Sequence, residues 1–136
     1  MTAKQSSDQQ PASHLIDPAA LEASRNLAIE IARLIHDRHG RDIVILEMAG
    51  RSPVAYHFVI ATGASEQQIR SVAREIEQLG KENNFRPLSR AGMQQGRWAL
   101  IDLVDVVVHL FDAEFRRFYD LELLWGDAPK LNWQRP

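Results

Sequence analysis

The amino-acid sequence predicts a mixed α/β fold in which helices pack on one mixed sheet of roughly five strands. First, residues 17–39 and 65–83 repeat apolar side chains at helical spacing. Second, residues 43–46 and 57–62 are almost entirely apolar, as is typical of short strands buried on both faces. Third, residues 97–111 contain two further apolar runs that are close enough in sequence to form a hairpin.

The length and composition fit a single domain that needs no covalent staple. The chain has 136 residues, 16 Lys plus Arg, 18 Asp plus Glu, and a net charge of −2. This balance argues against a protein that binds by neutralising many phosphates. The sequence contains no cysteine, which excludes disulfides, thiolate zinc sites and cysteine nucleophiles. Since no run is apolar enough to be a signal segment or a membrane span, we expect a cytoplasmic protein without membrane contact.

The apolar patterning also sets the expected boundaries of the domain. Residues 1–16 are rich in Gln, Ser and other polar residues, so they are expected to form a disordered tail. The folded domain is expected over residues 17–129, and residues 130–136 are expected to be a C-terminal tail.

Capping residues support the two long helices. Asp17 is a favourable N-cap, and Pro18 is tolerated at the first helical position. Gly40 suits the C-terminal end of that helix. Ser65 and Gln68 form a capping box at the start of the second long helix.

The turn at Gly63, Ala64 and Ser65 admits a second interpretation. A glycine turn that leads into a helix N-terminus can hold a phosphate, as nucleotidyl transferases do. Such enzymes also need paired carboxylates on a neighbouring strand to hold a divalent metal. The nearest pair, Asp102 and Asp105, flanks a predicted turn, where Asp is common for backbone reasons. A nucleotide-binding enzyme is therefore the disfavoured alternative, and no catalytic residue is predicted.

Two histidines near the end of the first helix raise the question of a metal site. His36 and His39 are three residues apart, but no motif supplies a third ligand. Cationic side chains near a helix C-terminus are favoured by the helix dipole in any case. We therefore expect neither a metal nor a cofactor.

Residues 83–101 hold three arginines and no acidic residue. A short edge strand is predicted from Arg86 to Arg90, because Pro87 cannot donate to a central ladder. Three charges would give only a weak, salt-sensitive contact with nucleic acid. Such a stripe is more often a solvated edge that discourages pairing between sheets.

The hairpin of residues 97–102 and 105–111 is expected to turn on Leu103 and Val104, which places Trp98 opposite His109. One face of the sheet then carries Trp98, Leu100, Val107, His109 and Phe111. The other face carries Ala99, Ile101, Val106, Val108 and Leu110, and must belong to the core.

A last helix is predicted from Asp112 to about Leu124, and it adds the apolar side chains Phe115, Phe118, Tyr119 and Leu121. Periodicity leaves two alternatives open for the Trp98 face. Either it is an exposed aromatic patch for protein–protein contact, or the last helix covers it and buries Trp98.

Several motifs, in this order, resemble one known family. They are Phe58-Val59-Ile60-Ala61-Thr62-Gly63, Trp98-Ala99-Leu100-Ile101-Asp102, Asp105-Val106-Val107-Val108-His109-Leu110-Phe111, Arg117-Phe118-Tyr119-Asp120-Leu121-Glu122 and Leu124-Trp125-Gly126-Asp127-Ala128-Pro129. Together they span about residues 18–129 and resemble the ribosomal silencing factor RsfS, or Iojap, family. Each motif is weak by itself, whereas the ordered set is specific. Most members carry Gly where Val104 stands.

The resemblance implies a nucleotidyltransferase-like α/β fold without the catalytic acids, and a non-enzymatic role. Family members bind the large ribosomal subunit through its universal fourteenth large-subunit protein, with little direct nucleic-acid contact. This binding sterically blocks joining of the small subunit and represses translation when nutrients are short. A large-subunit assembly factor that uses the same face remains an alternative function. A homodimer of the free protein is also consistent with an exposed aromatic face.

The resemblance also implies a set of partner-binding residues. Trp98 and Tyr119 match positions that the family uses for docking. Further candidates on the same face or the last helix are Asp102, His109, Arg116 and Glu122.

Overall fold

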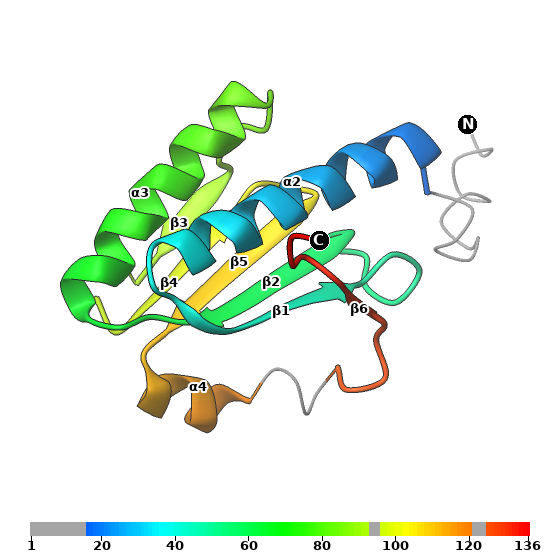
Figure 1. Cartoon of the computed structure of the whole chain (residues 1–136). Coiled ribbons are helices and arrows are strands. Elements are labelled where there is room, and N and C mark those ends of the chain that lie inside the picture. Colours follow the sequence, from blue (N-terminus) through cyan, green and yellow to red (C-terminus); the bar gives the residue numbers. More distant parts are fainter. Residues whose placement is uncertain (1–15, 93–95, 121–124) are drawn as a thin grey trace, which may run out of the picture.

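The computed structural model describes residues 16–92, 96–120 and 125–136, which form one six-stranded mixed sheet with three helices. The elements are α2 (Pro18–Asp37), β1 (Arg41–Glu47), β2 (His57–Thr62), α3 (Glu66–Glu82), β3 (Ser89–Ala91), β4 (Trp98–Asp102), β5 (Val106–Phe111), α4 (Ala113–Tyr119) and β6 (Lys130–Leu131). The long helices α2 and α3 lie side by side on one face of the sheet, and the short α4 lies on the other side (Figure 1). The predicted mixed α/β class is confirmed.

The strand order across the sheet is β3-β4-β5-β2-β1-β6. Only the central pair of β2 and β5 is parallel among the described pairs, and the other neighbours are antiparallel. Because β2 and β5 run in the same direction, their carboxyl ends meet at one end of the sheet. The chain passes from that end directly into α4, which fixes the position of this short helix.

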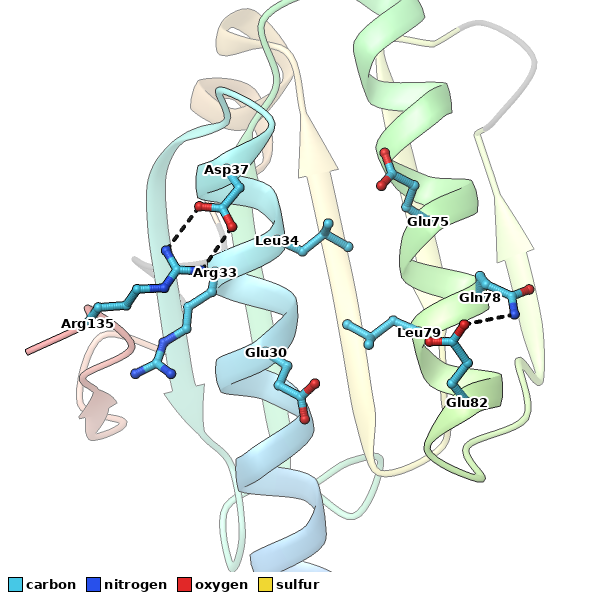
Figure 2. A pocket seen from close by; sticks show the side chains of 9 residues that line it. All are labelled: Glu30, Arg33, Leu34, Asp37, Glu75, Gln78, Leu79, Glu82 and Arg135. Atoms are coloured by element: carbon cyan, nitrogen blue, oxygen red, sulfur yellow. Dashed lines mark hydrogen bonds and ion pairs between the residues drawn. The ribbon is translucent and has the colours of Figure 1, made fainter.

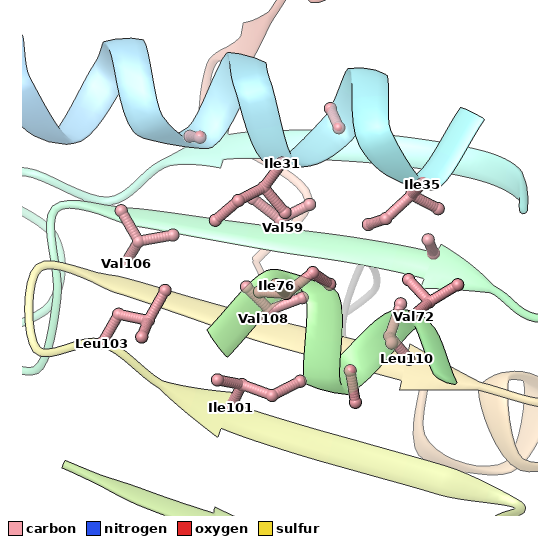
Figure 3. Packing of buried hydrophobic residues seen from close by; sticks show 14 of the residues in the cluster. Ile31, Ile35, Val59, Val72, Ile76, Ile101, Leu103, Val106, Val108 and Leu110 are labelled. Carbon is pink, nitrogen blue, oxygen red and sulfur yellow. The ribbon is translucent and has the colours of Figure 1, made fainter. Parts of the chain in front are cut away.

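The face under α2 and α3 holds the main hydrophobic core (Figure 3). Ile31 and Ile35 of α2, and Val72 and Ile76 of α3, point down onto the strands. On the sheet they meet the side chains of Val59, Ile101, Val106, Val108 and Leu110. The predicted apolar face of the hairpin is therefore core, as the alternation required.

The predicted N-caps of both helices are present, whereas the C-terminal end of α2 is formed by Arg38 and by His39 at a φ of 73° rather than by Gly40. The side chain of Asp17 accepts a hydrogen bond from the Ala19 amide at 3.0 Å. Ser65 Oγ accepts from the Gln68 amide at 3.0 Å, and Gln68 Oε1 accepts from the Ala64 amide at 2.8 Å. Each bond satisfies an amide that the helix itself leaves unpaired.

The predicted register of the hairpin is wrong by two residues. Trp98 lies opposite Phe111 rather than His109, and the turn is centred on Val104 and Asp105. The Leu103 amide donates to the Val106 carbonyl at 2.8 Å, and Val104 adopts a left-handed φ of 74°. A shift of two residues preserves which side chains share a face, so the predicted faces remain correct.

Residues 130–136 were expected to be a tail, but they take part in the fold. Leu131 and Lys130 pair with β1 as the edge strand β6. The Trp133 indole donates to the Ile43 carbonyl at 3.1 Å, and Arg33 Nε donates to the Trp133 carbonyl at 2.8 Å. A two-residue strand leaves no periodic signal in a sequence, which is why this segment was missed.

Two other predicted elements have different limits. The edge strand β3 covers Ser89–Ala91 rather than residues 86–90. Helix α4 ends at Tyr119, because Asp120 adopts a left-handed φ of 35°, and the predicted continuation to Leu124 falls on residues 121–124, outside the described part. The expected tail of residues 1–16 also falls outside it, except for Ile16. In the described part, no helix is long and apolar enough to cross a membrane.

Candidate functional site

The sheet face opposite α2 and α3 carries a second apolar cluster, here called the aromatic face. Its buried members are Leu46, Met48, Ala55, Phe58, Ile60, Val107, Phe111 and Ala128. Partly buried side chains that pack on them are Val44, Trp98, Leu100, Phe115 and Trp125. Among the described residues, the seven of α4 and the segment from Trp125 to Ala128 lie over this face, whereas the other face is covered by the two long helices. Large aromatic side chains that keep part of their surface in solvent are typical of protein–protein sites.

Aromatic contacts order the centre of the aromatic face. The His109 ring stacks on Phe111 at 6.0 Å and meets the edge of Phe58 at 5.4 Å between ring centroids. Phe58 also contacts Trp125 edge to face at 6.3 Å. The four rings therefore form one continuous aromatic cluster with stacked and edge-to-face geometries.

His109 is more a part of this cluster than an exposed contact residue. Burial lowers the pKa of His109 to about 4, so its imidazole is neutral at pH 7. Within the described residues, its Nε2 atom is buried and has no hydrogen-bond partner.

Trp98 is half-buried. It is therefore neither fully exposed nor fully covered, which were the two alternatives left open by the sequence. Its indole lies against the backbone of Gly92, and the φ of this glycine is 78°. A Cβ atom at Gly92 would come within 2.6 Å of Trp98 Cδ2 and 2.5 Å of the Trp98 carbonyl oxygen. Only a glycine satisfies both the backbone conformation and the close approach. Gly92 therefore fixes the position of Trp98.

Arg97 attaches α4 to the edge of the sheet. Its Nε donates to Asp112 Oδ2 at 2.9 Å, and its guanidinium also pairs with Glu114. The same guanidinium lies 4.3 Å from the centre of the Phe115 ring. One side chain thus holds the N-cap, the first turn and an aromatic side chain of α4.

Arg116 attaches α4 to strands β1 and β2. It donates to Thr62 Oγ1 at 3.0 Å and to the Asp42 carbonyl. Helix α4 then presents Phe118, whose residue surface is 80% exposed. A large aromatic side chain exposed on an anchored helix is a candidate anchor for a partner.

The predicted partner-binding residues do not all gather at one place. Trp98 and His109 lie on the aromatic face, and Asp102 lies at the far end of β4, where its Oδ1 accepts from the Val104 amide at 2.8 Å. Arg116 makes the internal contacts described above. Tyr119 is the last residue of α4, and its side chain, like all of Glu122, falls outside the described part.

Sequence reasoning missed three residues that shape this surface. Phe118 was recognised as aromatic but not chosen as a site residue, although its exposure is the largest of the exposed apolar residues described. Gly92 left no signal beyond being a glycine next to a predicted edge strand. Arg97 was counted with a basic stripe, whereas in the structure it pairs with Asp112, and Arg90 of the same stripe pairs with Glu77 at 3.0 Å.

The glycine turn and His36 have structural explanations. A Cβ atom at Gly63 would lie 2.2 Å from Ile69 Cγ1, so close packing against α3 accounts for this glycine. The His36 ring packs on Trp133 at 5.4 Å. Within the described residues, no group of three or more His, Asp or Glu side chains is placed to hold a metal ion.

A groove of about 520 Å³ separates α2 from α3 on the other face of the molecule (Figure 2). Leu34 and Leu79 point toward each other across it, below a rim of charged side chains. Several of these charges are satisfied within the chain, as in the Asp37–Arg135 ion pair at 2.9 Å. Glu75 likewise pairs with Arg38 at 2.9 Å.

Fold and surface together define a small mixed α/β protein with one helix-covered sheet face and one aromatic face. Residues 21–136 match the family model described as "Ribosomal silencing factor during starvation". A ribosomal silencing factor RsfS of Bacillus subtilis is 45% identical over 93 residues, which cover 68% of this chain and 79% of the relative. The chloroplastic protein Iojap of Arabidopsis thaliana is 32% identical over 107 residues, or 76% of this chain and 43% of that protein.

Solved structures agree with this result. A crystal structure of a Chromobacterium violaceum protein matches with a TM-score of 0.70 at 31% identity, over 85% of this chain and 89% of that one. A Bacillus halodurans protein matches with a TM-score of 0.64 at 33% identity, over 85% and 99%. The chain belongs to the RsfS family of ribosomal silencing factors, as the ordered motifs had indicated.

Proposed function

We propose that this protein binds the large ribosomal subunit with its aromatic face, through the universal fourteenth large-subunit protein. Bound there, it blocks joining of the small subunit and represses translation when nutrients are limiting. Its action is steric, so no catalytic step is required of it. The observation that carries the proposal is Phe118, an 80% exposed aromatic side chain on a helix that Arg97 and Arg116 anchor to the sheet. Family membership supports a ribosomal target.

The aromatic face suits a protein partner better than ribosomal RNA. Its accessible side chains are mainly apolar, and two of the three nearby arginines, Arg97 and Arg116 but not Arg117, have partners within the described part of the chain. Binding to RNA would instead require several unpaired cations directed at phosphates. Trp98 and Phe118 are the expected anchors, and Asp102, Tyr119 and Glu122 remain predicted contacts around them.

The test is co-sedimentation of the purified protein with isolated large or small subunits, followed by a subunit-joining assay. The wild type is expected to pellet with large subunits and to inhibit joining. Phe118→Glu places a charge in the interface and is expected to abolish both effects without changing the fold. Leu88→Glu is the matched control, since Leu88 is 69% exposed and lies beside Asp102, at the end of β4 away from α4. Equal pelleting of Phe118→Glu and wild type would contradict the proposal.

A second copy of the chain is the proposed partner of the same face when ribosomes are absent. Self-association would hide apolar surface that the monomer leaves in water. Sedimentation equilibrium is expected to show dimers of the wild type and monomers of Phe118→Glu. Dimers of equal stability in both proteins would place the self-contact elsewhere.

A further inference from the structure

A second hollow lies at the end of the sheet opposite α4. Here the β1–β2 loop, the β4–β5 turn and the N-terminal end of α2 come together (Figure 1). The hollow has a volume of about 290 Å³, and its lining residues are Ile16, Gly50, Ser52, Pro53, Val54, Ala55, Tyr56, Val104 and Asp105. This volume is below the range of pockets for drug-sized ligands and is sufficient for one side chain.

The walls of the hollow are apolar and partly open to solvent. Val54 is 63% exposed and Val104 is 50% exposed, which places both among the exposed large hydrophobic residues of the described chain. The backbone at Val104 has a φ of 74°, an unfavourable conformation for a β-branched residue. The turn thus presents an aliphatic side chain at the rim, at a cost in backbone energy.

One side chain of the lining, Asp105, carries a charge. Its backbone is fixed, because the Asp105 carbonyl accepts from the Tyr56 amide at 2.9 Å and from Ser24 Oγ at 3.2 Å. Its carboxylate has no hydrogen bond or ion pair with any described residue. Burial, together with the negative charge of Asp17, raises the pKa of Asp105.

This arrangement is unfavourable for the isolated protein. The Asp105 carboxylate loses hydration in the hollow, and the negative charge of Asp17, which lies outside the lining, disfavours its charged form further. A cation in the hollow would reverse both effects, and the apolar walls would hold an aliphatic stem behind it. A bare metal ion fits poorly, since the single carboxylate of the lining supplies too few oxygen ligands.

We propose that this hollow, the Asp105 pocket, binds the side chain of an arginine or lysine that a partner protein presents. The aliphatic part of that side chain would lie between Val54 and Val104, and its cationic group would meet the Asp105 carboxylate. The Asp105 pocket is at the other end of the sheet from α4, so it constitutes a contact separate from the aromatic face. The proposal therefore stands or falls independently of the proposed docking through Phe118.

The test uses the full chain and two blocked amino acids that differ only in charge. N-acetyl-arginine-N-methylamide is the cationic probe, and the citrulline analogue is its neutral match. Methyl NMR of Val54 and Val104 is expected to show saturable shifts with the arginine probe and at least about tenfold weaker binding of the citrulline probe. Equal shifts with both probes would mean that charge plays no part, and would overturn the proposal.

Asp105→Asn provides a second arm, because it keeps the side-chain shape and removes the charge. This variant is expected to lose about tenfold or more in arginine affinity while its melting temperature is unchanged or higher. Glu30→Gln makes the same change of charge in the α2–α3 groove and is expected to bind the probe as the wild type does. Unchanged affinity in Asp105→Asn would overturn the proposal.

The chain itself supplies a competing cation at Lys4, which lies outside the described residues. If Lys4→Gln shifts the Val54 and Val104 methyl signals in the absence of any probe, the occupant is this chain and not a partner. That result would overturn the assignment to a partner protein. Unchanged signals in Lys4→Gln support it.

Discussion

The two faces of the sheet are built from similar strands but are covered in different ways. On one face, α2 and α3 bury aliphatic side chains such as Ile31 and Ile76 completely. On the other face, the seven-residue α4 covers an aromatic cluster in which Trp98 and Trp125 keep part of their surface in solvent. The difference is consistent with the proposed function: aliphatic packing stabilises the fold, and the less covered aromatic face is the proposed surface for a partner.

The two faces should differ most in the change of unfolding free energy when one side chain on each face is truncated. Ile76→Ala removes a fully buried side chain between α3 and the sheet, so we expect it to cost about 2–5 kcal/mol of unfolding free energy. Phe118→Ala removes an exposed side chain and should change stability by less than about 0.5 kcal/mol. Urea unfolding measures the loss of stability in Ile76→Ala. Under conditions in which both variants are folded, only Phe118→Ala is expected to weaken binding to the large subunit.

The contrary result would be a Phe118→Ala variant whose unfolding free energy falls as much as that of Ile76→Ala. That outcome would make the aromatic face a second structural core.

Each face also contains one buried histidine, which makes stability depend on pH. Burial lowers the pKa of both His57, on the helix-covered face, and His109, on the aromatic face, to about 4. The unfolded chain takes up these protons near pH 6.5, so acid favours the unfolded state. The stabilising contribution is complete above pH 6.5 and is lost as the pH falls toward 4, by about 3 kcal/mol for each histidine at most.

Unfolding free energies of the wild type, His57→Gln and His109→Gln between pH 4 and 7 test this expectation. Each substitution should remove about half of the pH-dependent loss that the two histidines cause. Ser24 Oγ lies 2.6 Å from His57 Nδ1, so His57→Gln should also lower stability at pH 7. A stability that increases on acidification from pH 7 to pH 4 would contradict the neutral state of both rings.

The most specific effect on the surface is expected from Gly92→Ala. Both Gly92 and Gly50 have positive φ, at 78° and 80°, so alanine strains the backbone similarly at either position, by about 1 kcal/mol. At Gly92 the new methyl group also collides with Trp98, whereas at Gly50 it meets nothing within 4 Å. Gly92→Ala should therefore move the indole, change its fluorescence and weaken large-subunit binding.

Gly50→Ala is the control that separates backbone strain from displacement of the tryptophan. It should show only the part of the stability loss that comes from backbone strain, and keep wild-type fluorescence and binding. Equal binding by both alanine variants would show that the position of Trp98 is unimportant for docking.

The sequence predicted which side chains share the candidate surface, but not how far other segments of the chain cover them. Alternation along residues 97–111 correctly placed Trp98 and His109 on one face and Val108 on the other. It could not decide how far Trp98 is buried, because its cover comes from Gly92 and from elements distant in the chain. The roles of Arg97 and Arg116 were also hidden, since a charged residue in a sequence does not reveal its distant partner.

The sequence by itself determined what depends on near neighbours. Helix caps at Asp17 and Ser65, and the period of two along the strands, act over a few residues. The tertiary structure decided the hairpin register, with Val104 held at positive φ, and the recruitment of Leu131 as an edge strand. These features depend on free-energy differences summed over contacts between distant segments, which no local pattern contains. The same long-range packing left one face of the sheet closed and the other partly open.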